Sequence, residues 1–185
     1  MPEYTLPNST AYISTPASFW TSGFFPGSLY LLYERLAKYP RTSNNAPSTQ
    51  PPTKSLQLPS PAKLQSAARW WSQNLHAQAY LTDTHDLGFL IFPWARLGWE
   101  LDGSKECYQS MVVAAHGLAA RFDPTVECIR SWDTCFTKRY AFADPKEDFL
   151  VIIDNMMSML SAQNGDCASW SLVADFYLLL LLLQT

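Results

Sequence analysis

The sequence predicts an all-α protein built as one domain. Apolar residues recur every three or four positions in several successive segments, which is the spacing of a buried helical face. No segment alternates apolar and polar residues in the way that a half-buried strand does. The chain has 185 residues and 48% of them are apolar, so it can bury one hydrophobic core.

The first two predicted helices flank a polar segment. Residues 26–39 begin with Pro26, which suits the first turn of a helix, and continue with apolar residues at helical spacing: Leu29, Leu32, Tyr33 and Leu36. Residues 42–61 are rich in Pro, Ser, Thr and Asn, which predicts a solvated loop inside the domain. Helical spacing then returns at Leu64, Ala67, Ala68, Trp71, Leu75 and Ala79.

Three further helices are predicted in the second half of the chain. The apolar segment 88–101 contains Pro93, so we expect a helix that bends at this proline or starts late because of it. Ser104 is placed to cap the next helix, whose buried stripe would be Cys107, Tyr108, Met111, Val112, Ala115, Leu118 and Phe122. Residues 148–163 form the fifth predicted helix.

The fifth predicted helix carries a carboxylate in apolar surroundings. Within FLVIIDNMMSML, residues 149–160, Asp154 shares one helical face with Leu150, Val151, Ser158 and Ser161, while the opposite face is wholly apolar. A helix that is apolar nearly all round is buried on both sides, so we expect an inner helix with one face towards a cavity. An unpartnered carboxylate is costly to bury, and Asp154 therefore needs a structural partner or a chemical role.

A second polar insertion, THDLGF at residues 84–89, precedes an apolar helix. Asp86 could be an N-cap that accepts backbone N–H groups of the following turn, and His85 could be an ordinary surface residue. Asp154, taken alone, could be a buried carboxylate that is hydrogen-bonded by its neighbours or paired with an arginine. These structural interpretations stay open beside a catalytic one.

Charge and cysteine spacing argue against several kinds of partner. The net charge of -3 is spread over both halves without a basic run, so neither nucleic acid nor a membrane is expected as a partner. The four cysteines and three histidines lack the spacing of a zinc site or a disulfide framework, and we expect no metal and no cofactor. The first twenty residues show no secretory signal, which favours a reducing compartment, the cytoplasm.

Four motifs in series resemble the unsaturated glucuronyl hydrolases of glycoside hydrolase family 88, in particular fungal members. The motifs are WTSGFFPGSLYLLYE, THDLGF, IRSWD and FLVIIDNMM, and the resemblance covers most of the chain from Phe19 to Leu160. It implies an (α/α)6 barrel, in which inner helices point side chains into a central pocket. The related hydrolases of unsaturated rhamnogalacturonides match HDLGF and IIDNMM less well.

The resemblance also implies a reaction and the residues that carry it out. These enzymes hydrate the C4=C5 enol ether of a terminal unsaturated uronic acid, and the resulting hemiketal releases the neighbouring sugar. Asp154 matches the catalytic acid/base and Asp86 the second essential carboxylate. His85 and Trp20 match positions in the substrate pocket, and Trp132 offers another flat face for a sugar ring. Burial suits this chemistry because it favours the protonated form of an acid, which can donate to C4.

The chain departs from the family after Leu160, where a leucine-rich tail replaces the later helices of the barrel. We therefore expect a partial (α/α)6 barrel, with one incomplete catalytic domain over residues 1–185 and an aberrant tail from about residue 161. The partner would be an unsaturated uronic-acid oligosaccharide, and we expect no turnover by this chain alone. A non-catalytic fragment and a helical sugar-binding module stay open as alternatives, as do the parent polysaccharide and the oligomeric state.

Overall fold

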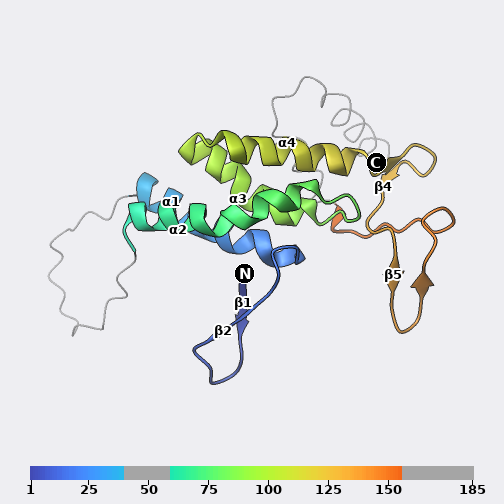
Figure 1. Ribbon diagram of the computed structural model, residues 1–185, viewed down its shortest axis with the longest axis horizontal. Coiled ribbons are helices and arrows are strands. Elements are labelled where there is room, and N and C mark those ends of the chain that lie inside the picture. Colours follow the sequence, from blue (N-terminus) through green and yellow to red (C-terminus); the bar gives the residue numbers. More distant parts are fainter. Residues whose placement is uncertain (40–58, 156–185) are drawn as a thin grey trace, which may run out of the picture.

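The computed structural model describes residues 1–39 and 59–155, and this part of the chain is mainly helical (Figure 1). Its α-helices are α1 (Phe24–Lys38), α2 (Pro61–Ser72), α3 (Leu87–Asp102) and α4 (Lys105–Ala119). Two 3-10 helices, η1 (Trp20–Gly23) and η2 (Gln73–Tyr80), precede α1 and follow α2. The helices expected around residues 26–39, 64–79, 88–101 and 107–122 are thus confirmed, although the second one changes to 3-10 geometry at Gln73 and the fourth ends at Ala119, before Phe122.

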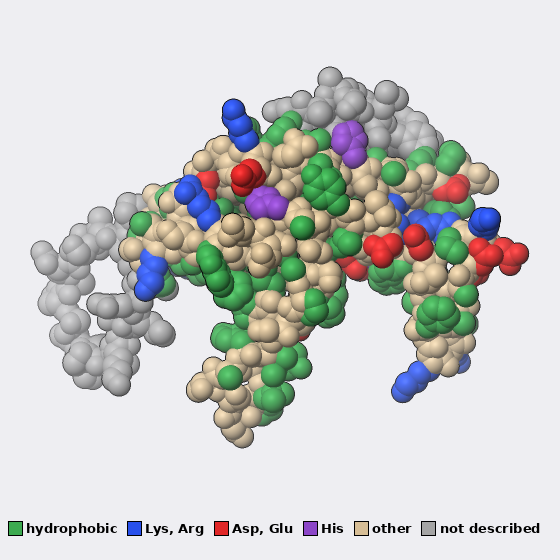
Figure 2. Space-filling view, in the orientation of Figure 1, with side chains coloured by type: hydrophobic (Ala, Val, Ile, Leu, Met, Phe, Trp, Pro, Cys, Tyr) green, Lys and Arg blue, Asp and Glu red, His purple; other side chains and the backbone are tan. Residues whose placement is uncertain are grey.

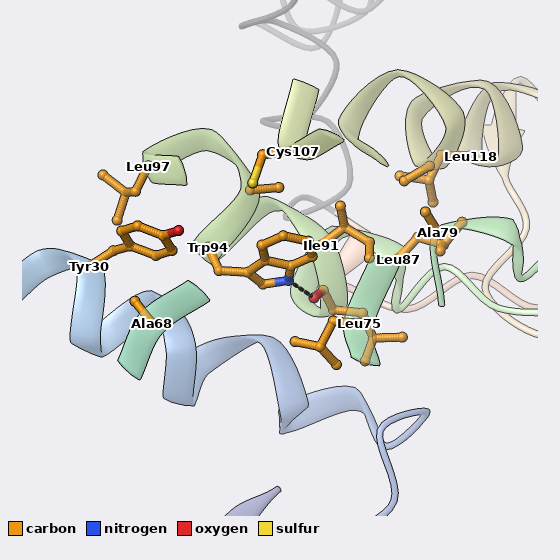
Figure 3. Packing of buried hydrophobic residues seen from close by; sticks show 13 residues of the cluster. Tyr30, Ala68, Leu75, Ala79, Leu87, Ile91, Trp94, Leu97, Cys107 and Leu118 are labelled. Atoms are coloured by element: carbon orange, nitrogen blue, oxygen red, sulfur yellow. Dashed lines mark hydrogen bonds between the residues drawn. The ribbon is translucent and has the colours of Figure 1, made fainter. Parts of the chain in front are cut away.

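Helix α3 is the inner helix of the described structure. It packs against α1 and α4 and also contacts α2, η1 and η2. Buried residues occur on more than one face of α3, and Trp94 at its centre donates from Nε1 to the carbonyl of Leu90 over 2.7 Å (Figure 3). Around it lie the other core residues drawn in Figure 3, including Tyr30, Ala68, Leu75, Ala79, Leu87, Ile91, Leu97, Cys107 and Leu118.

Pro93 lies inside α3 and does not delay its start, because the helix begins at Leu87. A proline has no N–H, so Pro93 cannot bond the carbonyl of Phe89 one turn earlier. Gly23 and Gly27 face this part of α3: an added Cβ would lie 2.1 Å from Phe89 O at Gly23 and 2.9 Å from Pro93 O at Gly27. The two glycines therefore let α1 and η1 approach the backbone of α3 closely.

Local capping follows the sequence prediction. The Ser104 side chain accepts a hydrogen bond from Cys107 N over 3.3 Å, which confirms it as the N-cap of α4. Gly103, just before it, ends α3 in the left-handed conformation with φ 63°, a backbone region that glycine enters without strain. This two-residue connection, Gly103 and Ser104, turns α4 back along α3, and the two helices lie side by side.

Three short antiparallel hairpins were not expected from the sequence. They pair β1 (Pro2–Thr5) with β2 (Tyr12–Ser14), β3 (Phe122–Asp123) with β4 (Cys128–Ile129), and β5 (Cys135–Phe136) with β6 (Ala141–Phe142). The β1–β2 hairpin projects from the helical body (Figure 1). Strands of two to four residues are too short to show alternation, which explains why no strand signal was visible.

The fifth predicted helix is wrong over its first half. Residues 149–153 are not helical, and Ile153 is 87% exposed instead of buried. The backbone of this segment is bonded to Ser131, which accepts from Ile152 N and donates to Leu150 O. Asp154 stands in a turn after it, so the predicted two-sided burial does not explain its position.

Some predictions fall on residues that the structure does not describe. These are residues 156–163 of the fifth predicted helix, the tail from about residue 161, and most of the loop at 42–61. Among the described residues, no helix is long and apolar enough to cross a membrane.

Candidate active site

The candidate site is formed where three distant chain segments meet. The segment before α3 and the segment after β4 form an isolated antiparallel bridge between Thr84 and Trp132. This bridge is extended by a hydrogen bond from His85 N to Ser131 O over 2.8 Å. The third segment, which ends at Asp154, is attached to Ser131. His85, Asp86, Trp132 and Asp154 are thereby brought together.

His85 lies at the centre of the site and is fully buried, so the interpretation of it as a surface residue is wrong. Its Nδ1 is 3.0 Å from the carbonyl oxygen of Ser131. A carbonyl can only accept, so Nδ1 carries the hydrogen, and Nε2 is the acceptor of the neutral ring. Nε2 lies 3.6 Å from Asp86 Oδ1 and 3.4 Å from Asp154 Oδ2.

Asp86 occupies the N-cap position of α3, but its side chain makes no capping hydrogen bond. The capping interpretation is therefore wrong for the carboxylate. Its backbone N–H donates to Thr84 Oγ1 over 3.0 Å, and its carboxylate points towards His85. With 21% of its side chain exposed, Asp86 can be reached from solvent.

Asp154 has one sheltered and one accessible side. Its side chain is 40% exposed, yet Oδ1 is buried and has no hydrogen-bond partner within the described part of the chain. Over the same residues no arginine lies within ion-pair distance of it, so the arginine-paired interpretation is wrong there. Asp154 thus keeps one carboxylate oxygen without a hydrogen-bond partner in the described part of the chain, unlike a carboxylate that serves only to hold the fold.

A hollow of about 380 Å³ opens beside Asp86. Trp132 and Asp133 line it on one side and Ser18, Thr84 and Asp86 on another. Figure 2 shows acidic side chains, with basic ones among them, between the helical body and the β5–β6 hairpin. The hollow is large enough for part of a sugar ring system and presents carboxylates to it.

The two tryptophans named from the sequence lie in different places. Trp132 borders the hollow, and its ring meets that of His85 edge-on, with centroids 5.0 Å apart at 67°. Trp20 is 46% exposed and belongs to an aromatic group on η1, α1 and α3, 5.7 Å from Phe89. Trp20 does not line the hollow, so its role as a stacking surface stays a prediction.

The carboxylates and the histidine form a cluster that the sequence spacing did not reveal. One ligand-type atom each from His85, Asp86 and Asp154 lies within 4.8 Å of the others. Such a group can share a proton, and its donor types also suit a cation. The expected absence of a metal therefore stays a prediction and rests on the proposed chemistry.

Sequence reasoning missed the residues that hold these side chains. Arg121 donates to the carbonyl oxygens of Thr82 and Ser131 and to Asp133 Oδ1. Asn155 donates to Ile129 O over 2.6 Å. Ser131 and Asp133 were visible only as members of the IRSWD motif. Arg121 carried no local signal, because most of its partners are backbone carbonyls that any sequence would supply and its one carboxylate partner, Asp133, lies twelve positions further along the chain.

Comparison with known proteins gives the same relationship from sequence and from fold. No family model matches the chain. The unsaturated glucuronyl hydrolase of Formosa agariphila is 30% identical over 145 residues, which cover 78% of this chain and 28% of that protein. The chain thus spans less than a third of the length of this curated relative.

Two solved structures share the fold. An unsaturated glucuronyl hydrolase specific for heparin matches with a TM-score of 0.66 and 26% identity, over 95% of this chain and 39% of that one. The unsaturated glucuronyl hydrolase from Streptococcus agalactiae matches with a TM-score of 0.57 and 22% identity, over 89% and 36%. The likeness to fungal members stays a prediction. The resemblance that the four motifs indicate is confirmed, since this chain is related to the unsaturated glucuronyl hydrolases and its helices form part of the same helical barrel.

Proposed function

We propose that this chain carries the catalytic carboxylates of a hydrolase that hydrates the C4=C5 double bond of a terminal unsaturated glucuronyl residue. The observation that carries the proposal is the meeting of Asp86 and Asp154 around buried His85, with Asp86 lining an open hollow. The sequence and fold relationship supports glycoside hydrolase chemistry on unsaturated uronic acids. The three described cysteines are free thiols, which fits the cytoplasmic location we propose.

Asp154 is assigned the acid/base role. As the neutral acid it donates its proton to C4, and the positive charge that develops at C5 is shared with the ring oxygen. Water then attacks C5 and Asp154, now a carboxylate, accepts the proton released by the water. The hemiketal opens to a ketone at C5, which turns the ring oxygen into a hydroxyl on C1. The resulting hemiacetal at C1 then collapses to an aldehyde, which breaks the glycosidic C1–O bond, and the hydroxyl proton ends on the oxygen of the neighbouring sugar as it leaves. One residue thus donates and recovers a single proton, and no other reactant than water is consumed.

The geometry supports this assignment in two respects. Part of the Asp154 side chain is exposed and can be reached by a substrate, while Oδ1 is buried and Oδ2 lies 3.4 Å from His85 Nε2. Asp86 and Asp154 both face His85 Nε2, at 3.6 and 3.4 Å, so the two carboxylates converge on one ring nitrogen. Asp86 is the second carboxylate of the proposed reaction and orients the substrate or Asp154.

The described residues supply only part of a pocket wall. This chain covers 39% of the heparin-specific hydrolase, so most of the corresponding barrel lies outside the matched region. We propose that the groups that hold the uronate carboxylate belong to that remaining portion. Because rate depends on holding the substrate close to its final geometry, we propose that turnover requires a longer form in which the barrel is completed. Without it, the same site would act as a helical sugar-binding surface.

The test is turnover of an unsaturated glucuronyl disaccharide, followed by the loss of its conjugated absorbance near neutral pH. We would compare this chain with the completed barrel, and each with the saturated disaccharide as substrate control. We expect turnover of the unsaturated sugar by the completed barrel only. No turnover by a folded, completed barrel would overturn the proposed function, and comparable turnover by the short chain would overturn the need for completion.

A further inference from the structure

We propose that Ser131 is a positioning residue that holds His85 and the segment carrying Asp154 in register. The catalytic consequence rests on the proposed function, whereas the structural part stands on hydrogen bonds alone. Ser131 is fully buried, and its N–H, carbonyl and hydroxyl groups are all bonded. The partners belong to the two segments that bring His85 and Asp154 to the site.

Towards Asp154, Ser131 makes three ties. Its N–H donates to Leu150 O over 2.7 Å. Its hydroxyl oxygen accepts from Ile152 N over 3.0 Å, and the hydroxyl donates to Asn155 Oδ1 over 3.2 Å. These contacts bracket Asp154, because Ile152 and Asn155 lie on either side of it in the chain. Residues 149–154 are in neither a helix nor a strand, so hydrogen bonds to Ser131 determine the course of their backbone.

Towards His85, the carbonyl oxygen of Ser131 accepts from the backbone N–H over 2.8 Å and from Nδ1 of the ring over 3.0 Å. Both the main chain and the ring of His85 are thereby attached to one oxygen. The ring contact leaves Nε2 directed at Asp86 and Asp154. Ser131 therefore determines which ring nitrogen meets the carboxylates as well as where the ring lies.

Arg121 is a further hydrogen-bond donor to the carbonyl oxygen of Ser131. Its guanidinium donates to Ser131 O over 3.1 Å and to Asp133 Oδ1 over 2.9 Å, and it also bonds the carbonyl of Thr82. It is nearly buried, with 9% of its surface exposed. One buried cation thus bonds the segment before His85 and the segment containing Ser131, which limits their relative movement.

The structural arm of the test uses this chain. In Ser131→Ala the N–H and carbonyl remain, so only the hydroxyl ties to Ile152 and Asn155 are lost. We expect NMR hydrogen exchange of the Ile152 amide to quicken by about tenfold or more, while the His85 amide changes by less than about threefold. Side-chain 15N spectra should show His85 protonated at Nδ1 in both proteins.

The matched control is Ser110→Ala. Ser110 is another buried serine, and its hydroxyl lies 2.7 Å from Nδ1 of His76. This change should alter the His76 signals and leave the exchange of Ile152 and the tautomer of His85 unchanged. If Ser131→Ala does not fold, Asn155→Ala removes one of the hydroxyl ties together with the bond from Asn155 Nδ2 to Ile129 O, and keeps the bond to Ile152, so exchange should quicken around Asp154 but less at the Ile152 amide.

The catalytic arm uses the completed barrel. We expect Ser131→Ala to lower kcat by about 10- to 100-fold with KM within about threefold, since displacement of a reacting group by a fraction of an ångström is costly in rate. Ser131→Thr, which keeps the hydroxyl, should recover part of the loss. A purely structural serine would lower the amount of folded enzyme but leave kcat per folded molecule unchanged.

The outcomes separate the two proposals. A His85 ring that carries no hydrogen at Nδ1, or an Ile152 amide whose exchange is unaffected by loss of the hydroxyl, overturns the positioning role whatever the activity. Faster exchange with unchanged kcat overturns its catalytic consequence alone. Absence of turnover by the unaltered, folded barrel refutes the proposed function, and the positioning role is then decided by exchange and tautomer.

Discussion

Asp102 and Asp154 show two uses of a carboxylate in one small protein. Asp102, at the end of α3, has 1% of its side chain exposed and accepts from Tyr30 Oη, Gln65 Nε2 and Arg69 Nε over 3.2, 2.6 and 2.9 Å. Asp154 is 40% exposed, keeps one oxygen without a partner in the described structure, and lies beside His85. The first is saturated with donors and the second is not.

The size of the neighbouring hollow does not distinguish the two residues. A hollow of about 430 Å³ borders Asp102, against about 380 Å³ beside Asp86 and its cluster. The two carboxylates differ in how many of their hydrogen-bond acceptor sites remain unused. Every donor around Asp102 stabilises its charged form, and burial together with that charge raises the pKa of Tyr30. A carboxylate bonded in this way holds elements together, whereas one with spare capacity can exchange a proton with a ligand.

The largest expected effect is on rate. Asp154→Asn in the completed barrel should lower kcat by about 10²- to 10⁴-fold, because the amide cannot donate and recover the proton. Stability should change by less than about 1 kcal/mol, since Asp154 has few partners to lose. Turnover and urea unfolding measure the two effects. The exposed acid Glu147 provides the control as Glu147→Gln, and near-normal turnover by a folded Asp154→Asn protein would show that Asp154 is structural.

The second largest effect is on stability and falls on Asp102. Asp102→Ala leaves the buried hydroxyl of Tyr30 and the amide of Gln65 without their acceptor and breaks the bond to Arg69. We expect the free energy of unfolding to fall by about 3 kcal/mol, measured by urea denaturation. Arg69→Ala isolates the contribution of the exposed partner and should cost about 1 kcal/mol or less. If Asp102→Ala costs less than about 1 kcal/mol, Asp102 does not hold the fold and does not differ from Asp154 in this respect.

A smaller effect is the pH dependence of stability that arises from His76, which lines the hollow beside Asp102. Burial lowers the pKa of His76 from its ordinary 6.5, so the folded protein binds this proton less readily than the unfolded chain. The stability associated with neutral His76 is therefore present above pH 6.5 and is lost as pH falls through the lower pKa of the folded state. Unfolding curves between pH 7 and 5 should show this decline. In His76→Gln the decline should be shallower, and an identical slope would contradict the assignment.

The smallest expected effect is that of divalent cations. Proton transfer alone suffices for the proposed hydration, so we expect magnesium, calcium or zinc to leave the melting temperature and any turnover unchanged, as should a chelator. The His85, Asp86 and Asp154 cluster makes this worth measuring, because its atoms lie close enough to share an ion. Stabilisation by one of these cations that Asp86→Asn removes would reassign the cluster as a metal site.

Local chemistry by itself predicted four helices that the structure describes and singled out three candidate site residues. The apolar spacing of residues 26–39 and 88–101 is satisfied by helical geometry whatever the rest of the chain does, and Ser104 caps the helix that follows it. His85, Asp86 and Asp154 stood out because polar groups in apolar runs demand a partner or a role. These inferences need only a few consecutive residues.

Only the tertiary structure decided how the site is held. The apolar run before Asp154 has helical spacing, yet its backbone is bonded to Ser131 instead of to itself. Trp132 meets His85 through a bridge between segments that are far apart in sequence, while Trp20 lies in a separate aromatic group. Apolar spacing predicts which residues are buried, but it does not predict which distant donor or acceptor bonds a given backbone N–H or carbonyl. That choice is made when the segments pack together, because each buried N–H and carbonyl must then find a partner.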